Sequence, residues 1–161
     1  MRAAVLTVSD RVSSGEAEDR SGAVLEELLR ADGYDVTRRL VPDEIDEIAA
    51  AIRELAEDAE LVITTGGTGL AARDVTPEAT RGVLEREAPG IPEALRADSL
   101  AKTPHGMLSR GTAGTIARAL VVNLAGSPGA CRDGYAVLKP ALPHALRLLA
   151  DQRTATDHVH T

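Results

Sequence analysis

The chain has 161 residues, of which 43% are hydrophobic and 27% charged, and this length and composition predict one folded domain and exclude an intrinsically disordered chain. Its formal net charge is -7, and two Tyr residues are its only aromatics. Proteins that bind duplexes need a basic face and those that bind single strands need stacking rings, so nucleic acid is not an expected partner.

The first half of the chain alternates between strand-like and helix-like segments. Apolar residues at 3–8 predict a strand, and a polar loop at 9–18 follows it. Apolar residues at helical spacing predict a helix over 19–31. The less apolar segment 34–41 is typical of an edge strand. A continuous apolar stripe opposite charged residues predicts the clearest helix of the chain, over 44–60.

The middle of the chain repeats this alternation. Residues 61–65 are apolar and β-branched and predict a strand buried on both faces. Thr76 and Pro77 indicate the start of another helix, with Thr76 as the N-cap and proline at a position where its missing N–H is tolerated. Prolines and a glycine at 89–92 end that helix before an amphipathic helix at 93–102.

The last third contains one more strand. Residues 103–118 are rich in Gly and Thr and predict a hairpin or a loop. Residues 119–124 predict a second buried strand, and residues 126–129 a turn. The remainder is expected to be helical, with interruptions at Pro140 and Pro143.

Together these elements predict a three-layer α/β/α fold with a largely parallel sheet. We expect this domain to occupy residues 1–152 and a polar tail to occupy residues 153–161. In such folds ligands bind beyond the carboxyl ends of the strands. The loops expected to meet there are 9–18, 42–43, 66–76 and 126–129.

Several classes of protein are not expected from the remaining features. The single cysteine, Cys131, excludes an intrachain disulfide and is interpreted as a small buried side chain. The four histidines have no spacing that predicts a zinc or haem site. The first apolar run is too short for a secretion signal, and no uncharged apolar stretch approaches the ~18 residues that a membrane helix needs. We therefore expect a cytoplasmic protein with no membrane partner.

The segment 64–78 contains the densest chemical signal. Gly66, Gly67 and Gly69 follow a buried strand and allow the backbone to approach a ligand closely, while Thr68 adds a hydroxyl. The pattern is neither a Walker A motif nor the dinucleotide fingerprint. A tight turn between strand and helix would explain one or two of these glycines, so a phosphate-binding loop and a structural turn both stay open.

Two aspartates are candidate metal ligands. Asp74 is not needed to cap the following helix if Thr76 does so, and its carboxylate could hold Mg²⁺ or pair with Arg73. Asp43 precedes the helix at 44–60 and could be a metal ligand or an ordinary N-cap. Both acids should lie at the same edge of the sheet, where two carboxylates could organise one metal–phosphate complex.

A second anion site is expected where the turn at 126–129 opens a helix. Free amide groups and the helix dipole attract anions there, and Ser127 is equally suited to cap the helix. The segments 9–11 and 19–22 can contribute to the same opening or serve as loop and cap residues.

The order and spacing of these motifs resemble the Mog/MoaB family of molybdenum cofactor biosynthesis. The most diagnostic are Thr-Gly-Gly-Thr-Gly at 65–69 and Arg-Asp-Val-Thr-Pro-Glu-Ala-Thr at 73–80. The other matching segments are 7–11, 19–22, 42–43, 109–110, 113–114, 123–124 and 126–128. The resemblance covers residues 5–149. It implies a molybdopterin-binding domain, usually a homotrimer, that adenylylates molybdopterin with Mg-ATP and releases pyrophosphate.

The resemblance also implies roles for single residues. Asp43 and Asp74 match the family's essential acids and would be catalytic and bind Mg²⁺. The residues expected to bind molybdopterin or the nucleotide are Ser9, Asp10, Gly66, Gly67, Thr68, Gly69, Arg73, Ser109, Gly126, Ser127 and Pro128. The side chains available to neutralise the two anionic reactants are those of Arg11, Arg73 or Arg110.

The chain departs from the family pattern at two positions. Ala125 replaces a frequent proline, and Gly129 stands where many adenylyltransferases carry lysine. Loss of that lysine removes a phosphate contact. A MoaB-like protein that binds molybdopterin with little or no adenylyl transfer is therefore the alternative.

Overall fold

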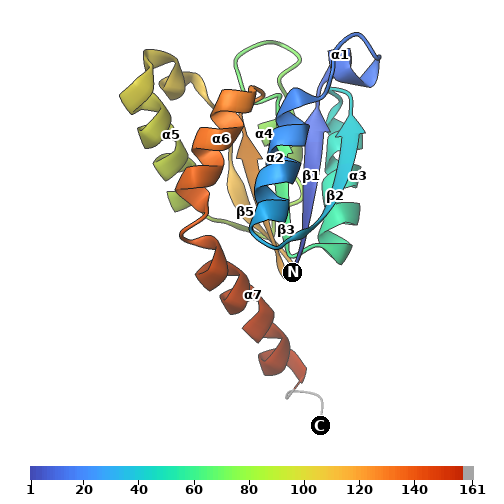
Figure 1. Cartoon of the computed structure of the whole chain (residues 1–161). Coiled ribbons are helices and arrows are strands. Elements are labelled where there is room, and N and C mark those ends of the chain that lie inside the picture. The colour runs from blue at the N-terminus through green and yellow to red at the C-terminus, as the bar shows by residue number, and fades with distance from the viewer. Residues whose placement is uncertain (158–161) are drawn as a thin grey trace.

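The computed structural model describes residues 1–157, and the side chains of residues 1–151 (Figure 1). One six-stranded sheet forms the middle layer. Its spatial order is β2 (Asp35–Val41), β1 (Arg2–Val8), β3 (Leu61–Thr65), β6 (Ala119–Leu124), β5 (Ala113–Ile116) and β4 (Arg86–Glu87). The first four strands are parallel, and β5 and β4 are antiparallel. The largely parallel sheet and the edge position of β2 confirm the sequence prediction.

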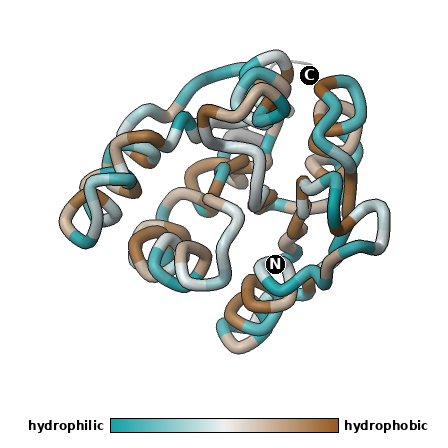
Figure 2. The backbone as a smooth tube through the Cα atoms, turned by 90° about the horizontal axis from the view of Figure 1, so that it is seen from above, coloured by the Kyte–Doolittle hydropathy of each residue, from teal (hydrophilic) through white to brown (hydrophobic). Residues whose placement is uncertain are grey.

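Helices cover both faces of the sheet and complete the three layers. The helices are α1 (Asp10–Ser13), α2 (Arg20–Ala31), α3 (Ile45–Asp58), α4 (Thr76–Arg81), α5 (Gly90–Lys102), α6 (Pro128–Leu138) and α7 (Leu142–Asp157), with a short 3₁₀ helix, η1 (Pro104–Leu108). Helices α2 and α6 pack on one face, and α3 and α4 pack on the other (Figure 1). Seen from above, brown and teal segments alternate along the helices, as expected for helices that bury one side (Figure 2).

The alternating strand residues divide the apolar core between the two faces. Val5 and Ile63 lie with Leu25 on the α2 side, whereas Leu6 lies with Ile52 on the α3 side, and all five are fully buried. Strands β1, β3 and β6 are buried on both faces because helices cover them above and below. Ligand-binding loops can therefore vary at the strand ends while the core holds the strands fixed.

Several element boundaries differ from the sequence prediction. The loop 9–18 contains the short helix α1, because the hydroxyl of Ser9 accepts a hydrogen bond from the Val12 amide and caps a single turn. Helix α5 begins at Gly90 rather than residue 93, since the proline at position 92 lies in the first turn, where proline is tolerated. The segment 103–118 contains η1 and then β5, which forms a hairpin with β6.

The C-terminal helix extends below the sheet (Figure 1). Leu142, Leu146 and Leu149 of α7 are buried in the core, whereas Leu148 is exposed. The helix includes residues 153–157, which the sequence assigned to a polar tail, and residues 158–161 lie outside the described part of the chain. Within residues 1–157, no helix has the length and apolarity needed to cross a membrane.

Candidate active site

A cavity of about 370 Å³ lies at the carboxyl ends of the parallel strands. Its walls come from the loops that follow β1, β2, β3 and β6, so the four loops singled out in the sequence do converge. The lining residues are Thr7, Val8, Ser9, Val12, Glu18, Asp19, Arg20, Ser21, Asp43, Thr65, Gly66, Gly67, Asp74, Gly126 and Pro128. In Figure 1 this edge of the sheet is the upper one.

The glycine loop after β3 is shaped by close packing. Gly66 and Gly67 have φ values of +100° and +69°, a region that disfavours any side chain. A Cβ on Gly66 would meet the carbonyl oxygen of Val8, and one on Gly67 would meet the hydroxyl of Thr76. The loop's own geometry therefore requires both glycines, and the same geometry brings backbone to the cavity wall.

The carboxylate of Asp43 points into this cavity and does not cap a helix. Glu44 occupies the N-cap position of α3, and no side chain caps that helix. The Asp43 carboxylate accepts a hydrogen bond from the Asp10 amide instead, at 2.8 Å. Burial raises the pKa of Asp43, and the negative charges of Asp10 and Asp74 raise it further, while Arg73 opposes the shift. The N-cap alternative for Asp43 is thus excluded by its geometry.

Asp74 lies on the opposite wall of the cavity. Its Oδ2 accepts a hydrogen bond from the Ala71 amide at 3.1 Å, and Gly69 leaves room for this carboxylate because it has no side chain. Arg73 does not pair with it. Among the side chains of residues 1–151, no Lys or Arg forms an ion pair with Asp43 or Asp74. The two acids therefore share one cavity without a neutralising side chain.

This pair of acids fits a magnesium ion better than a metal enclosed by protein ligands. Within the described part of the chain, no group of three or more His, Cys, Asp or Glu side chains is arranged to hold a metal. Magnesium characteristically binds through one or two carboxylates and completes its shell with water and substrate phosphates. Asp43 and Asp74 supply that number of carboxylates.

Thr76 is the first residue of α4 and not its N-cap, which corrects the sequence prediction. Val75 occupies the cap position, and no side chain caps the helix. The Thr76 hydroxyl instead donates to the Gly66 carbonyl, because the chain folds back over the glycine loop. Asp74 still takes no part in capping, so the consequence drawn from the wrong assignment survives.

Two of the arginines expected to face the reactants are used by the protein. Arg73 binds the Asp10 carboxylate through Nε at 2.6 Å and also reaches Glu44 at 2.8 Å. Arg110 donates to the carbonyl oxygens of Gly69 and Asp74, at 2.8 and 2.6 Å, and pairs with Glu78. Both guanidinium groups thus support the loop between β3 and α4 from outside the cavity.

Arg20 is the arginine that lines the cavity. It forms only a loose ion pair with Glu18, at 3.8 Å, and both side chains are largely exposed. Sequence reasoning placed the 19–22 segment near the opening but chose Arg11, Arg73 and Arg110 as the relevant cations. Adjacency to the N-cap aspartate of α2 was the signal that could have favoured Arg20.

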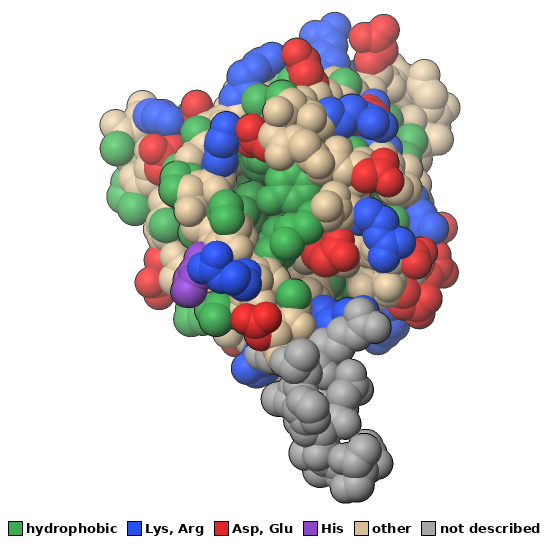
Figure 3. Space-filling model, turned by 60° about the horizontal axis from the view of Figure 1, so that its bottom comes forward, with side chains coloured by type: hydrophobic (Ala, Val, Ile, Leu, Met, Phe, Trp, Pro, Cys, Tyr) green, Lys and Arg blue, Asp and Glu red, His purple; other side chains and the backbone are tan. Residues whose placement is uncertain are grey.

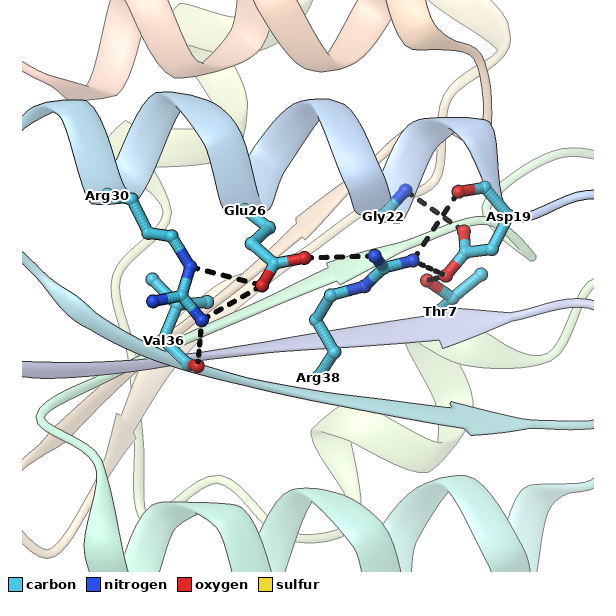
Figure 4. A network of polar contacts seen from close by, with 7 residues as sticks. All are labelled: Thr7, Asp19, Gly22, Glu26, Arg30, Val36 and Arg38. Carbon is cyan, nitrogen blue, oxygen red and sulfur yellow. Dashed lines mark hydrogen bonds and ion pairs between the residues drawn. The ribbon is translucent and has the colours of Figure 1, made fainter.

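Asp19, also in the cavity wall, is fully engaged in a polar network (Figure 4). One carboxylate oxygen caps α2 by accepting from the Gly22 amide at 3.0 Å. The other accepts from Thr7 at 2.8 Å and from Arg38 at 2.7 Å, and Arg38 also pairs with Glu26. Asp19 therefore anchors the N-terminus of α2 beside the cavity, which confirms the cap interpretation of this segment.

A second cavity, of about 360 Å³, lies between α5, α6 and the end of β6. Ser109 and Ser127 line it, and the Ser127 hydroxyl also caps α6 by accepting from the Ala130 amide at 3.1 Å. Its cationic side chains, Arg96 and Lys102, come from α5 and were not singled out in the sequence. The turn at 126–129 separates the two cavities, since Gly126 and Pro128 line the first and Gly129 lines the second.

The expected site residues are thus distributed over two cavities and their support. The first cavity contains Ser9, Asp43, Gly66, Gly67, Asp74, Gly126 and Pro128; the second contains Ser109 and Ser127; and Asp10, Thr68, Gly69 and Arg73 line neither. Cys131 is buried, its thiol lies 3.2 Å from the Thr65 hydroxyl, and burial raises its pKa, so it is a structural residue as expected.

Comparisons with known proteins identify relatives of the whole fold. Residues 4–144 match the family model described as a probable molybdopterin binding domain. The chain is 38% identical over 150 residues to the molybdopterin adenylyltransferase of Helicobacter pylori, covering 90% of this chain and 85% of that protein. The crystal structure of the molybdopterin biosynthesis enzyme MoaB from Thermus thermophilus superposes with a TM-score of 0.86 at 45% identity, covering 92% of this chain and 95% of that one.

Longer proteins contain a similar segment. The chain is 38% identical over 160 residues to the molybdenum cofactor synthesis protein cinnamon of Drosophila melanogaster. The match covers 97% of this chain but spans only 27% of the fly protein. The present fold is therefore found both as most of a protein and as one part of a larger one.

Proposed function

The chain belongs to the family of probable molybdopterin-binding domains, and from that premise we propose that it is a molybdopterin adenylyltransferase of molybdenum cofactor biosynthesis. The terminal phosphate of molybdopterin attacks the α-phosphorus of ATP. A new phosphorus–oxygen bond forms, the bond to the β-phosphate breaks, and pyrophosphate leaves. One observation carries this proposal: two carboxylates without partner cations, Asp43 and Asp74, share a cavity with a glycine loop.

The reaction joins two anions, so its main requirement is local neutralisation of charge. Phosphoryl transfer needs positioning and electrostatic stabilisation rather than a side-chain nucleophile. Asp43 and Asp74 would hold Mg²⁺, which would bridge and neutralise the phosphate oxygens of ATP. Arg20 and the backbone amides around Gly66 and Gly67 face the same space and would orient the triphosphate.

The two cavities suit two reactants. We assign ATP to the cavity with the acids, where Ser9 and the glycine loop are available to its phosphates. Molybdopterin then occupies the second cavity, where Ser109, Ser127, Arg96 and Lys102 offer polar and positively charged groups. The turn at 126–129 lies between the cavities, which is where the two reacting phosphates have to meet.

We also propose that the protein is cytoplasmic and forms a closed homo-oligomer, with a trimer as the expected size. Helix α7 protrudes from the domain and leaves Leu148 exposed. On the lower face, apolar side chains gather near the centre and charged side chains surround them (Figure 3). Light scattering tests this part of the proposal, and a monomer at all micromolar concentrations would contradict it.

The decisive experiment incubates the purified chain with molybdopterin, ATP and Mg²⁺ and measures adenylylated pterin and pyrophosphate by mass spectrometry. We expect both products in equal amounts, and none when a chelator is in excess. Unchanged turnover in excess chelator would show that the metal assignment is wrong. If molybdopterin binds but no product forms with metal present, the chain is a molybdopterin-binding protein without transferase activity.

A further inference from the structure

We propose that Asp10 and Arg73 are positioning residues that hold Asp43 at the cavity wall, and that neither of them contacts the nucleotide or the metal. This inference rests on the proposed function, in which the carboxylate of Asp43 holds the metal. It gives Asp10 and Arg73 a different role from the ligand-binding one that the sequence motifs suggest.

The first observation is a reciprocal pair of hydrogen bonds between the loops after β1 and β2. The Asp10 amide donates to Oδ2 of Asp43 at 2.8 Å, and the Asp43 amide donates to Oδ1 of Asp10 at 3.0 Å. The two strands end side by side, with Val8 paired to Val41. Each carboxylate therefore fixes the backbone of the other residue, and the orientation of Asp43 depends directly on Asp10.

The second observation is that the two carboxylates share their work unequally. Both oxygens of Asp10 are taken by protein donors: Oδ2 by Nε of Arg73, and Oδ1 by the Asp43 amide and Nη2 of Arg73 at 3.2 Å. Asp43 uses only Oδ2 in this way, and its Oδ1 faces Gly67 in the cavity wall. Asp43 thus keeps an oxygen for a ligand, whereas Asp10 has none to spare.

The third observation is that Arg73 joins three loops. It belongs to the loop after β3, binds Asp10 in the loop after β1, and reaches the Asp43 carbonyl at 3.2 Å and the Glu44 carboxylate at 2.8 Å after β2. Asp74 is its neighbour in sequence. The guanidinium therefore sets the position of one metal-binding acid relative to the other.

The planar fork of arginine matters for this arrangement. Its Nε and Nη2 engage both oxygens of Asp10, and Nη2 also faces the Asp43 carbonyl. Lysine has the same charge but offers a single nitrogen on a flexible chain and cannot reproduce this geometry. Arg73→Lys thus separates the positioning role from the charge.

The test uses the full-length chain with Arg73→Lys, Asp10→Asn and Asp10→Ala. Loss of residues that orient metal ligands typically lowers activity or metal affinity by about 10–100-fold, and we expect kcat to fall by that factor in Arg73→Lys and Asp10→Ala. The KM values for ATP and molybdopterin should stay within about twofold of the wild type, because no substrate contact is lost. Asp10→Asn keeps an acceptor for the Asp43 amide and should lose less than Asp10→Ala.

A second readout needs neither substrate nor metal. Amide hydrogen exchange measured by NMR in the metal-free protein should accelerate at Asp10 and Asp43 in Arg73→Lys and Asp10→Ala. Arg39→Lys is the matched control, because Arg39 lies on β2 and forms an exposed ion pair with Glu54, away from these loops. We expect Arg39→Lys to leave kcat and the exchange of both amides unchanged.

The proposal is overturned if Arg73→Lys raises KM for ATP about tenfold at unchanged kcat, since Arg73 would then bind the nucleotide. It is also overturned if exchange at Asp10 and Asp43 is the same in all variants. Should the wild type form no product, the proposed function fails, but the exchange measurement still decides the positioning role. Asp10→Asn, the mildest change, provides the comparison if Asp10→Ala does not fold.

Discussion

The hydroxyl of Thr76 donates a hydrogen bond to the carbonyl oxygen of Gly66 at 2.9 Å, which closes the loop that carries Asp74. Thr76 is completely buried, and the Gly67 carbonyl accepts a further bond from the Thr76 amide at 3.1 Å. The base of the loop is therefore held by one residue at two points. Its rigidity places the glycines and Asp74 against the acid from the neighbouring loop.

Thr76→Val should destabilise the protein while preserving the size of the side chain. The Gly66 carbonyl would lose its donor in a partly buried position, which typically costs about 1–3 kcal/mol of unfolding free energy. Thr76→Ser keeps the hydroxyl and serves as the control. Urea denaturation of the two variants checks the difference, and equal stabilities would show that the hydroxyl contributes nothing.

Asp74→Asn should remove activity without removing the fold. Asparagine can still accept the hydrogen bond from the Ala71 amide, so the melting temperature should change little. Loss of one electrostatic stabiliser typically lowers kcat by ~10²-fold or more, and we expect that loss here. Glu57→Gln, which removes one charge from the exposed surface of α3, is the control. Near wild-type turnover of Asp74→Asn at saturating Mg²⁺ would contradict a metal-binding role.

Asp43→Asn should lower activity by a similar ~10²-fold and raise the stability of the metal-free protein at neutral pH. Burial raises the pKa of Asp43 above its ordinary 3.8, so the folded state pays a penalty when this acid is ionised. The penalty is absent below pH 3.8, grows as pH rises toward the raised pKa, and stays constant above it.

Thermal melts across that pH range check this prediction. The melting temperature of Asp43→Asn should exceed that of the wild type at neutral pH, and the gap should narrow as the pH is lowered toward 3.8. A gap that does not depend on pH, or a lower melting temperature at neutral pH, would show that Asp43 is not held at an energetic disadvantage.

Gly67→Ala should destabilise the glycine loop. A side chain at a φ of +69° costs about 1–2 kcal/mol, and the new methyl group would also crowd the Thr76 hydroxyl. Gly129→Ala is the matched control, because Gly129 lies in the first turn of α6 with open space around it. Alanine favours helix by up to about 1 kcal/mol there. Calorimetry that finds the two variants equally stable would contradict the packing argument.

The sequence by itself determined the order of the elements and the edge of the sheet where the loops meet. Apolar runs such as 61–65 and 119–124 are short, continuous and bounded by glycine, and these are local properties that depend on no distant contact. Alternation with helices then restricts the topology to a largely parallel sheet. The convergence of Asp43 and Asp74 follows from that topology, since both acids lie in loops at the carboxyl ends of strands.

Only the tertiary structure decided which groups those side chains contact. Arg73 binds Asp10 across 63 positions of sequence, and Asp10 and Asp43 exchange hydrogen bonds across 33. Thr76 bonds the loop behind it instead of capping its own helix, and the turn at 126–129 divides the expected site into two cavities. Hydrogen bonds of this kind depend on distances of a few ångströms between separate loops, and the packing of the strands beneath sets those distances, which no local pattern encodes.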